Sequence, residues 1–101
     1  MRSEKHQQNN LALYRRRMRF TQKQVAKLLG HADATMVSHY EHGRALPPLV
    51  TALSLEIIYR TPVAFLFPAL RDELHRRIRK EEEILAAAPG QQSFQLKTTT
   101  Q

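Results

Sequence analysis

The stretch from Thr21 to Gly43, TQKQVAKLLGHADATMVSHYEHG, constrains the fold more than any other part of the chain. Thr21 and Gln24 have the spacing of a capping box, in which each side chain accepts the free backbone N–H of the other residue at the start of a helix. Gly30 follows the last apolar residue, where helices often end in a left-handed conformation. Asp33 is a good N-cap for a second helix. Two helices joined by so short a turn predict a helix-turn-helix.

The two helices differ in the side chains they present. In the first, apolar residues recur at helical spacing: Val25, Ala26, Leu28 and Leu29. In the second, Val37 and Tyr40 are predicted to face inward, and the other side chains are small, polar or adaptable: Ala34, Thr35, Met36, Ser38 and His39. Such a face can lie against a polyanion, and the second helix of a DNA-binding helix-turn-helix enters the major groove. The alternative is an ordinary helical corner in a small helical protein.

The positive charge of the chain is concentrated before this motif. The formal net charge is +7. Residues 1–20 contribute +5, because they hold one acidic residue, Glu4, and six basic residues: Arg2, Lys5, Arg15, Arg16, Arg17 and Arg19. A basic cluster can be a solvated helix face, but its position beside a helix-turn-helix favours contact with nucleic-acid phosphates.

Other classes of function find no support in the sequence. The chain has no cysteine, which excludes a disulfide framework or a thiolate metal site. His39 and His42 lie one helical turn apart, but no third ligand follows at a spacing that predicts a zinc site. Ser38 and His39 are adjacent, so they do not face each other as a nucleophile and a base must. We therefore expect no enzyme, no metal and no cofactor.

Membrane or exported proteins have sequence signals that this chain lacks. Its N-terminus, MRSEKHQQNN, has no apolar segment typical of a signal peptide. No apolar run approaches the roughly 20 residues of a membrane span. We expect a cytoplasmic protein, associated with the nucleoid.

Three further helices are expected around the motif. Asn9 or Asn10 can cap one that runs to about residue 18. After the motif, two prolines precede a helix over residues 49–59, whose predicted inner stripe is Leu49, Leu53 and Ile57. Thr61 is predicted to cap a short fifth helix.

The sequence therefore predicts four segments. These are a flexible N-terminus at residues 1–8, an all-α domain of five helices at residues 9–67, a long helix at residues 68–88 and a disordered tail at residues 89–101. The long helix has an apolar stripe: Leu70, Leu74, Ile78 and Leu85. Two interpretations of this stripe stay open, because it can pack back on its own domain or form a contact with a second copy or a partner.

Four pieces of sequence occur in one order across residues 11–67. They are an Arg six residues before TQ, then TQ..VA..LG, then S.YE.G.R..P, and an L-F that ends the fifth helix. Together they resemble the Xre/Cro-type, phage lambda repressor-like family of helix-turn-helix regulators. The resemblance implies a five-helix, lambda-repressor-like DNA-binding domain with an extended C-terminal helix.

The resemblance also implies roles for single residues. Gln22, first in its helix, would bind a backbone phosphate, as would Arg44 just past the second helix, and Lys23 belongs to the same DNA-binding set. The positions that match base-facing ones are Ala34, Thr35, Met36 and His39, with Ser38 at their edge. Arg15 and Glu41 match a pair that forms a partly buried salt bridge, so Glu41 is expected to be structural.

The chain departs from the family pattern at three points. The turn GHAD is one residue longer than in many members, so the register of the second helix is fixed here from Ser38 to Glu41. Arg19 stands where glycine is usual, so either this residue adopts an uncommon backbone conformation or the turn differs. Ala34 replaces a glutamine that reads adenine, which favours apolar base contacts such as the thymine methyl group.

The function implied is sequence-specific binding of double-stranded DNA by a homodimer on an inverted repeat, with repression of transcription as the default output. The alternative is an antitoxin-like or other protein-interaction module that binds a partner through residues 68–101 and regulates its own operon. Burial of the C-terminal stripe favours the first function, and its exposure favours the second.

Overall fold

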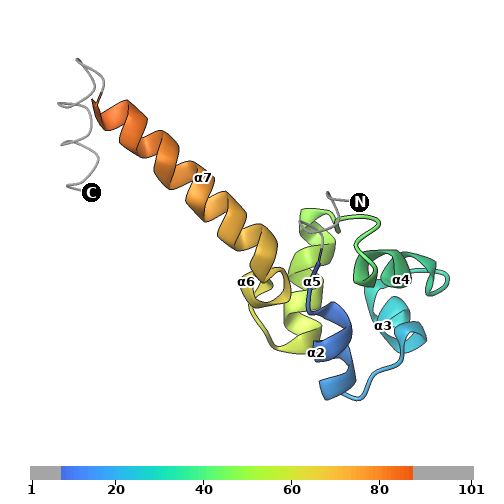
Figure 1. The fold of residues 1–101 in the computed structure, drawn as a ribbon. Helices are drawn as coiled ribbons and strands as arrows, with labels where there is room; N and C mark the ends of the chain where they lie inside the picture. The colour runs from blue at the N-terminus through green and yellow to red at the C-terminus, as the bar shows by residue number, and fades with distance from the viewer. Residues whose placement is uncertain (1–7, 88–101) are drawn as a thin grey trace. The chain divides into compact units, whose positions relative to one another are not determined.

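The computed structural model describes residues 8–87, and these residues form six α-helices and no β-strand (Figure 1). The helices are α2 (Leu11–Arg17), α3 (Gln22–Leu29), α4 (Thr35–Glu41), α5 (Leu49–Tyr59), α6 (Val63–Leu66) and α7 (Pro68–Ala87). The described part of the chain is thus all-α, as the sequence predicts. It divides after Arg71 into two units. The expectations for residues 1–7 and 88–101 lie outside the described residues.

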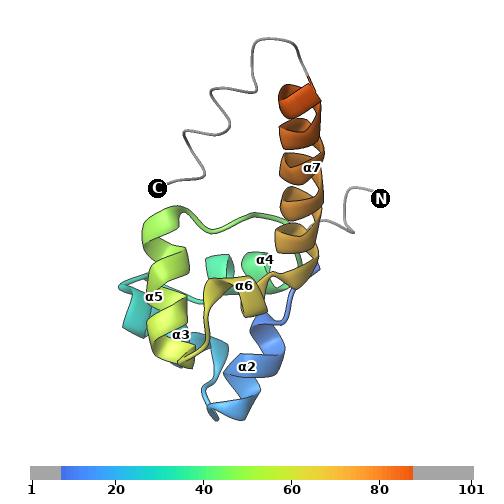
Figure 2. The same ribbon diagram turned by 90° about the vertical axis from the view of Figure 1, so that its left-hand side faces the viewer.

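The helices of the first unit enclose one core (Figures 1 and 2). In it, α3 packs against α4 and α5, α5 packs against α6, and α2 packs against α4. Each helix from α2 to α6 contributes to the buried set, which is Leu11, Val25, Ala26, Val37, Tyr40, Leu55, Tyr59, Leu66 and, just after α6, Phe67. Leu70 also packs against this core, so the unit continues into the first turn of α7.

Both ends of α3 form as predicted. Thr21 Oγ1 accepts the N–H of Gln24 at 3.0 Å, and Gln24 Oε1 accepts the N–H of Thr21 at 2.9 Å, which completes the capping box. Gly30 ends the helix with φ +82°, a conformation that glycine adopts without strain. The predicted apolar face is only partly correct: Val25, Ala26 and Leu29 pack in the core, and Leu28 is exposed.

The start of α4 differs from the prediction. The N-cap position is Ala34 and not Asp33. The Asp33 carboxylate still accepts the N–H of Thr35 at 2.9 Å, because a short carboxylate side chain readily bonds to a backbone N–H two residues further on. Hydrogen bonds from the backbone and then the side chain of Thr35 hold the pKa of Asp33 below its usual value. The helix therefore begins one residue later than expected.

The predicted inner stripe of α5 faces outward. Leu49, Leu53 and Ile57 are 73%, 47% and 74% exposed. The inner side chains are Leu55 and Tyr59, each 2% exposed, and burial raises the pKa of the Tyr59 phenol above its usual value. Apolar residues occur on nearly every side of this helix, so their spacing does not distinguish the inner face. The packing of α3 and α6 against α5 determines which face of α5 is buried.

The start of α6 is capped from α5 and not by Thr61, which corrects another expectation. The Glu56 carboxylate accepts the N–H of Val63 at 3.0 Å. Thr61 instead donates its hydroxyl to the carbonyl of Tyr59 at 2.9 Å, and Pro62 occupies the N-cap position. The Glu56 carboxylate is thus hydrogen-bonded within the protein.

The second unit, within the described residues, is the part of α7 at residues 72–87. It has no buried side chain. Arg79 Nη1 donates to both carboxylate oxygens of Glu82, at 2.9 and 3.0 Å. Four large apolar side chains are exposed: Leu74, Ile78, Ile84 and Leu85. Among residues 8–87, no helix combines the length and apolar character needed to cross a lipid bilayer.

Candidate nucleic-acid interface

The outward side of α4 is the centre of the candidate interface. Val37 and Tyr40 are 2% and 4% exposed, which fixes the opposite side of the helix toward solvent. The predicted base-facing residues are exposed or partly exposed, and we name them the α4 outer face: Ala34, Thr35, Met36, Ser38 and His39. Together they offer hydroxyl, imidazole and thioether groups, which supply hydrogen-bond donors, acceptors and apolar surface.

Two exposed side chains at the ends of α4, Asp33 and His42, are not among the residues that the resemblance assigns to DNA binding. At the start, Asp33 bonds to Thr35 and adds a carboxylate beside the α4 outer face. At the end, His42 Nδ1 lies 2.8 Å from the carbonyl oxygen of Ser38 and 3.3 Å from its hydroxyl. Since a carbonyl oxygen only accepts, this contact requires the proton on Nδ1. The sequence signal for Asp33 and His42 is their position at the two ends of the predicted second helix.

A buried ion pair holds the C-terminal end of α4. Arg15 of α2 and Glu41 of α4, which the resemblance pairs, are 13% and 5% exposed. Arg15 Nε donates to Glu41 Oε2 at 2.5 Å, and Arg15 Nη2 donates to Oε1 at 3.2 Å. The hydrogen bond to Glu41 raises the pKa of Arg15 above its usual value. Arg15 Nη1 also donates to the carbonyl of Phe20 at 3.1 Å, so the guanidinium joins α2, α4 and the turn before α3.

Gln22 adds α3 to this network. Its Nε2 donates to Glu41 Oε1 at 2.9 Å. An amide nitrogen has two N–H groups, so this bond uses one of them and not the second. The bond brings the first turn of α3 to the last turn of α4, close in the chain to Arg44. Lys23 and Arg44 are both exposed.

The basic segment at the end of α2 is also exposed. Arg16, Arg17 and Arg19 all have exposed side chains. The Arg17 guanidinium lies 5.1 Å from the ring centre of Tyr14, a cation–π distance. Arg19 has φ +65°, so of the two alternatives at this glycine-preferring position, the residue adopts the uncommon conformation.

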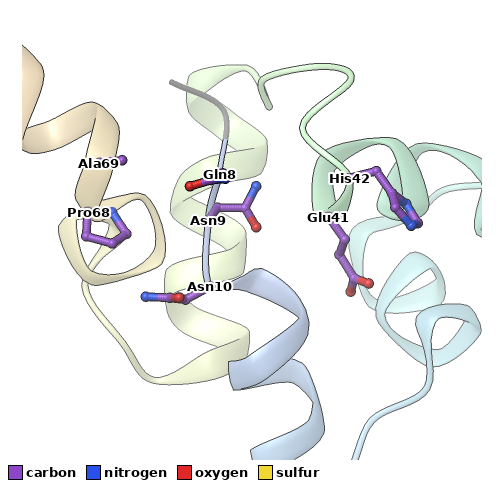
Figure 3. Close-up of a pocket in the computed structure, with 7 residues that line it drawn as sticks. All are labelled: Gln8, Asn9, Asn10, Glu41, His42, Pro68 and Ala69. Carbon is purple, nitrogen blue, oxygen red and sulfur yellow. The ribbon is translucent and has the colours of Figure 1, made fainter. Parts of the chain in front are cut away.

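A groove of about 520 Å³ lies beside the end of α4 (Figure 3). Its lining residues are Gln8, Asn9, Asn10, Glu41, His42, Pro68 and Ala69. Asn9 Nδ2 donates to the carbonyl of Tyr40 at 2.9 Å, and Asn10 Nδ2 donates to that of Phe65 at 3.1 Å. These two bonds hold residues 9 and 10 against α4 and α6. Because both amides and the Glu41 carboxylate bond within the protein, they do not form a convergent set of polar groups for a ligand.

Among residues 8–87, no group of three or more His, Cys, Asp or Glu side chains is arranged so that it could hold a metal ion. Comparisons with protein-family models, with curated proteins and with solved structures found no match.

Proposed function

We propose that this chain is a sequence-specific, double-stranded-DNA-binding transcriptional regulator of the Xre/Cro type that acts as a repressor. The observation behind the proposal is the α4 outer face, which presents hydrogen-bonding side chains while Val37, Tyr40 and Glu41 hold the helix from behind. Base edges in a major groove offer matching donors, acceptors and thymine methyl groups. In this proposal the helices α2 to α6 form a lambda-repressor-like domain with α4 as the recognition helix.

The base contacts follow from the chemistry of each side chain. Thr35 and His39 would hydrogen-bond to base edges, and Met36 and Ala34 would contact thymine methyl groups. The second carboxylate oxygen of Asp33 would accept from the amino group of a cytosine, the base that acidic side chains recognise. Sequence preference would therefore come from both polar and apolar contacts.

The phosphate contacts would come from the sides of α4. Gln22 and Lys23 in the first turn of α3, and Arg44 just after α4, would supply an amide N–H and two cations. Such contacts orient a protein on DNA without reading its sequence. Each phosphate neutralised adds about −0.9 to the slope of log affinity against log salt concentration, so binding should weaken steeply as salt rises.

The proposed assembly is a homodimer on an inverted repeat. Its two α4 helices would enter successive major grooves about 34–36 Å apart. Binding of this kind needs no metal or cofactor, and it would take place in the cytoplasm, on the nucleoid.

The test is selection of bound sequences from random double-stranded DNA by the full chain, followed by the salt dependence of binding to the enriched site. An enriched inverted repeat, with affinity that falls steeply with salt, supports the proposal. Weak binding with no enriched sequence contradicts it.

A second candidate function is favoured by the exposed apolar side chains of α7, which are Leu74, Ile78, Ile84 and Leu85. It is an antitoxin-like or other protein-interaction module that binds a partner through residues 68–101 and regulates its own operon. A reporter gene behind the enriched site distinguishes the two candidates. Repression by the chain alone that survives Leu74→Glu with Ile78→Glu supports the plain regulator. Repression that requires a second protein on α7 supports the alternative.

A further inference from the structure

His42 is the C-cap residue of α4, and its imidazole ring is held by Ser38, one helical turn earlier. The Ser38 carbonyl oxygen accepts the backbone N–H of His42 at 3.0 Å, and His42 Nδ1 lies 2.8 Å from the same oxygen. A carbonyl oxygen has two lone pairs, so it can accept both bonds. The Nδ1 proton is therefore bound within the protein, and the ring gains or loses its charge at Nε2.

The groove beside this ring holds little competing charge (Figure 3). Among the described residues that line it with His42, Glu41 is the one that carries a charge, because the others are amides or apolar: Gln8, Asn9, Asn10, Pro68 and Ala69. The Glu41 carboxylate already accepts hydrogen bonds from Arg15 and Gln22. Outside the groove, His39 belongs to the same helix and Arg44 follows two residues later.

His42 also extends the α4 outer face toward the proposed phosphate contacts. It follows Ser38 by four residues, so the two side chains share one side of the helix. At the same end of α4, Gln22 bonds to Glu41 at 2.9 Å, and Arg44 comes just after the helix. His42 and Arg44 are both exposed. His42 thus lies at the end of α4 from which Gln22 and Arg44 would contact the DNA backbone.

We propose that His42 is a further phosphate-binding residue, and that its contact with DNA takes up one proton from the solvent. In the neutral ring Nε2 carries a lone pair, which does not bond to an electron-rich phosphate oxygen. When Nε2 takes up a proton, it donates a charge-assisted hydrogen bond to that oxygen while Nδ1 stays bonded to Ser38. Imidazole groups change charge between about pH 5 and pH 8, so DNA affinity rises as the pH falls through this range.

This inference rests on the proposed function for its ligand and adds a dependence of DNA affinity on pH. A phosphate contact does not read sequence, so the effect of His42 is the same on the enriched site and on random DNA. His39 differs, because it faces base edges in the proposed function and would act mainly on the enriched site. Comparison of the two DNAs therefore separates the two histidines.

The first experiment needs no DNA. NMR spectra of the ¹⁵N-labelled full chain at about pH 8.5, above the range in which imidazole is charged, show which ring nitrogen carries the proton. The spectrum of His42→Gln identifies the His42 signals by their loss. We expect the proton of the neutral His42 ring on Nδ1. A neutral ring with its proton on Nε2 would overturn the inference, because that ring could donate to a phosphate without taking up a proton.

The second experiment measures affinity for the enriched site and for random DNA at about pH 6 and about pH 8. From the higher to the lower pH, the affinity of the wild type should rise roughly 10-fold more than that of His42→Gln, the effect of one hydrogen bond between charged groups. His42→Lys has a permanent charge, so its pH dependence should match that of His42→Gln while it binds more tightly than the wild type at the higher pH. His75→Gln, at an exposed position on α7, is the matched control and should keep the pH dependence of the wild type. Circular dichroism checks that each variant folds.

The salt dependence identifies the contact as one to phosphate. On lowering the pH, the slope of log affinity against log salt concentration should steepen by about 0.9 more in the wild type than in His42→Gln. An enriched site with equal pH dependence in these two proteins overturns the inference and keeps the proposed function. Binding to random DNA that strengthens at low pH only when His42 is present, with no enriched sequence, keeps the inference and removes the proposed function.

Discussion

The helices α4 and α5 follow each other in one unit, and each has a buried and an exposed side, but their exposed sides have opposite chemistry. On α4, Thr35 and His39 offer hydrogen-bonding groups that suit a polar partner. On α5, Leu49 and Ile57 offer hydrocarbon, which is unfavourable in water. The comparison teaches that exposure alone does not identify a partner. The chemistry of the exposed side suits a polar partner on α4 and an apolar partner on α5.

The two helices are also held in place differently. α4 has seven residues, too few to be a stable helix alone, and its end depends on the ion pair of Arg15 and Glu41. α5 has 11 residues and is fixed by Leu55 and Tyr59 in the core. A single substitution can therefore remove the ion pair that holds α4, and another can remove a core side chain that holds α5.

The largest expected effect comes from the polar support of α4. Arg15→Ala leaves the Glu41 carboxylate, 5% exposed, without its cationic partner. We expect the free energy of unfolding to fall by about 3–5 kcal/mol, measured by urea unfolding at low protein concentration. The control is Arg16→Ala, an exposed neighbour expected to change stability by about 0.5 kcal/mol or less. Small losses for both variants would show that the ion pair does not hold α4.

The next largest effect is expected when a side chain is shortened to alanine on the buried side or on the exposed side of α5. Leu55→Ala should cost about 2–5 kcal/mol because it leaves a cavity in the core. Ile57→Ala should cost about 0.5 kcal/mol or less. Thermal unfolding measures both effects, and equal losses would contradict the assignment of the faces.

The helices α3 and α5 show how much of the fold the sequence predicts. For α3, the capping box at Thr21, the apolar spacing and Gly30 all indicate the same helix, and the structure agrees. For α5, the bounds are correct but the inner face is wrong, because apolar residues occur all around the helix. Which side faces inward depends on how α3 and α6 pack against it, and the spacing within one helix does not contain that information.

The sequence also predicts the candidate site only in part. The sequence predicts an outward position for Thr35 and Met36, and both are exposed. It does not predict that Gln22 bonds to Glu41 or that His42 bonds to Ser38. These bonds depend on side-chain rotamers and on the distance between helices, which no local pattern specifies.

Substitutions on the α4 outer face and substitutions of the phosphate-contacting residues should have different effects on DNA affinity. Thr35→Ala and His39→Ala should each cost about 1–3 kcal/mol on the enriched site and little on random DNA. Arg44→Ala should weaken both equally and reduce the magnitude of the salt slope by about 1. Val50→Ala, on the exposed side of α5, is the control and should leave DNA binding unchanged. Equal losses on both DNAs for Thr35 and His39 would contradict the register of α4.

The smallest expected effect concerns two backbone positions outside both exposed faces. Arg19 and Arg60 have φ of +65° and +53°, where an L side chain costs about 1–2 kcal/mol. Arg60 ends α5 in the left-handed conformation that favours glycine. Arg19 precedes α3.

We expect Arg19→Gly and Arg60→Gly each to raise the free energy of unfolding by about 0.5–1 kcal/mol, because relief of strain exceeds the added freedom of the unfolded chain. Arg16→Gly, the same change inside α2, should instead lower it by about 1 kcal/mol. Urea unfolding measures all three, and stability losses at Arg19 and Arg60 would contradict the strain argument.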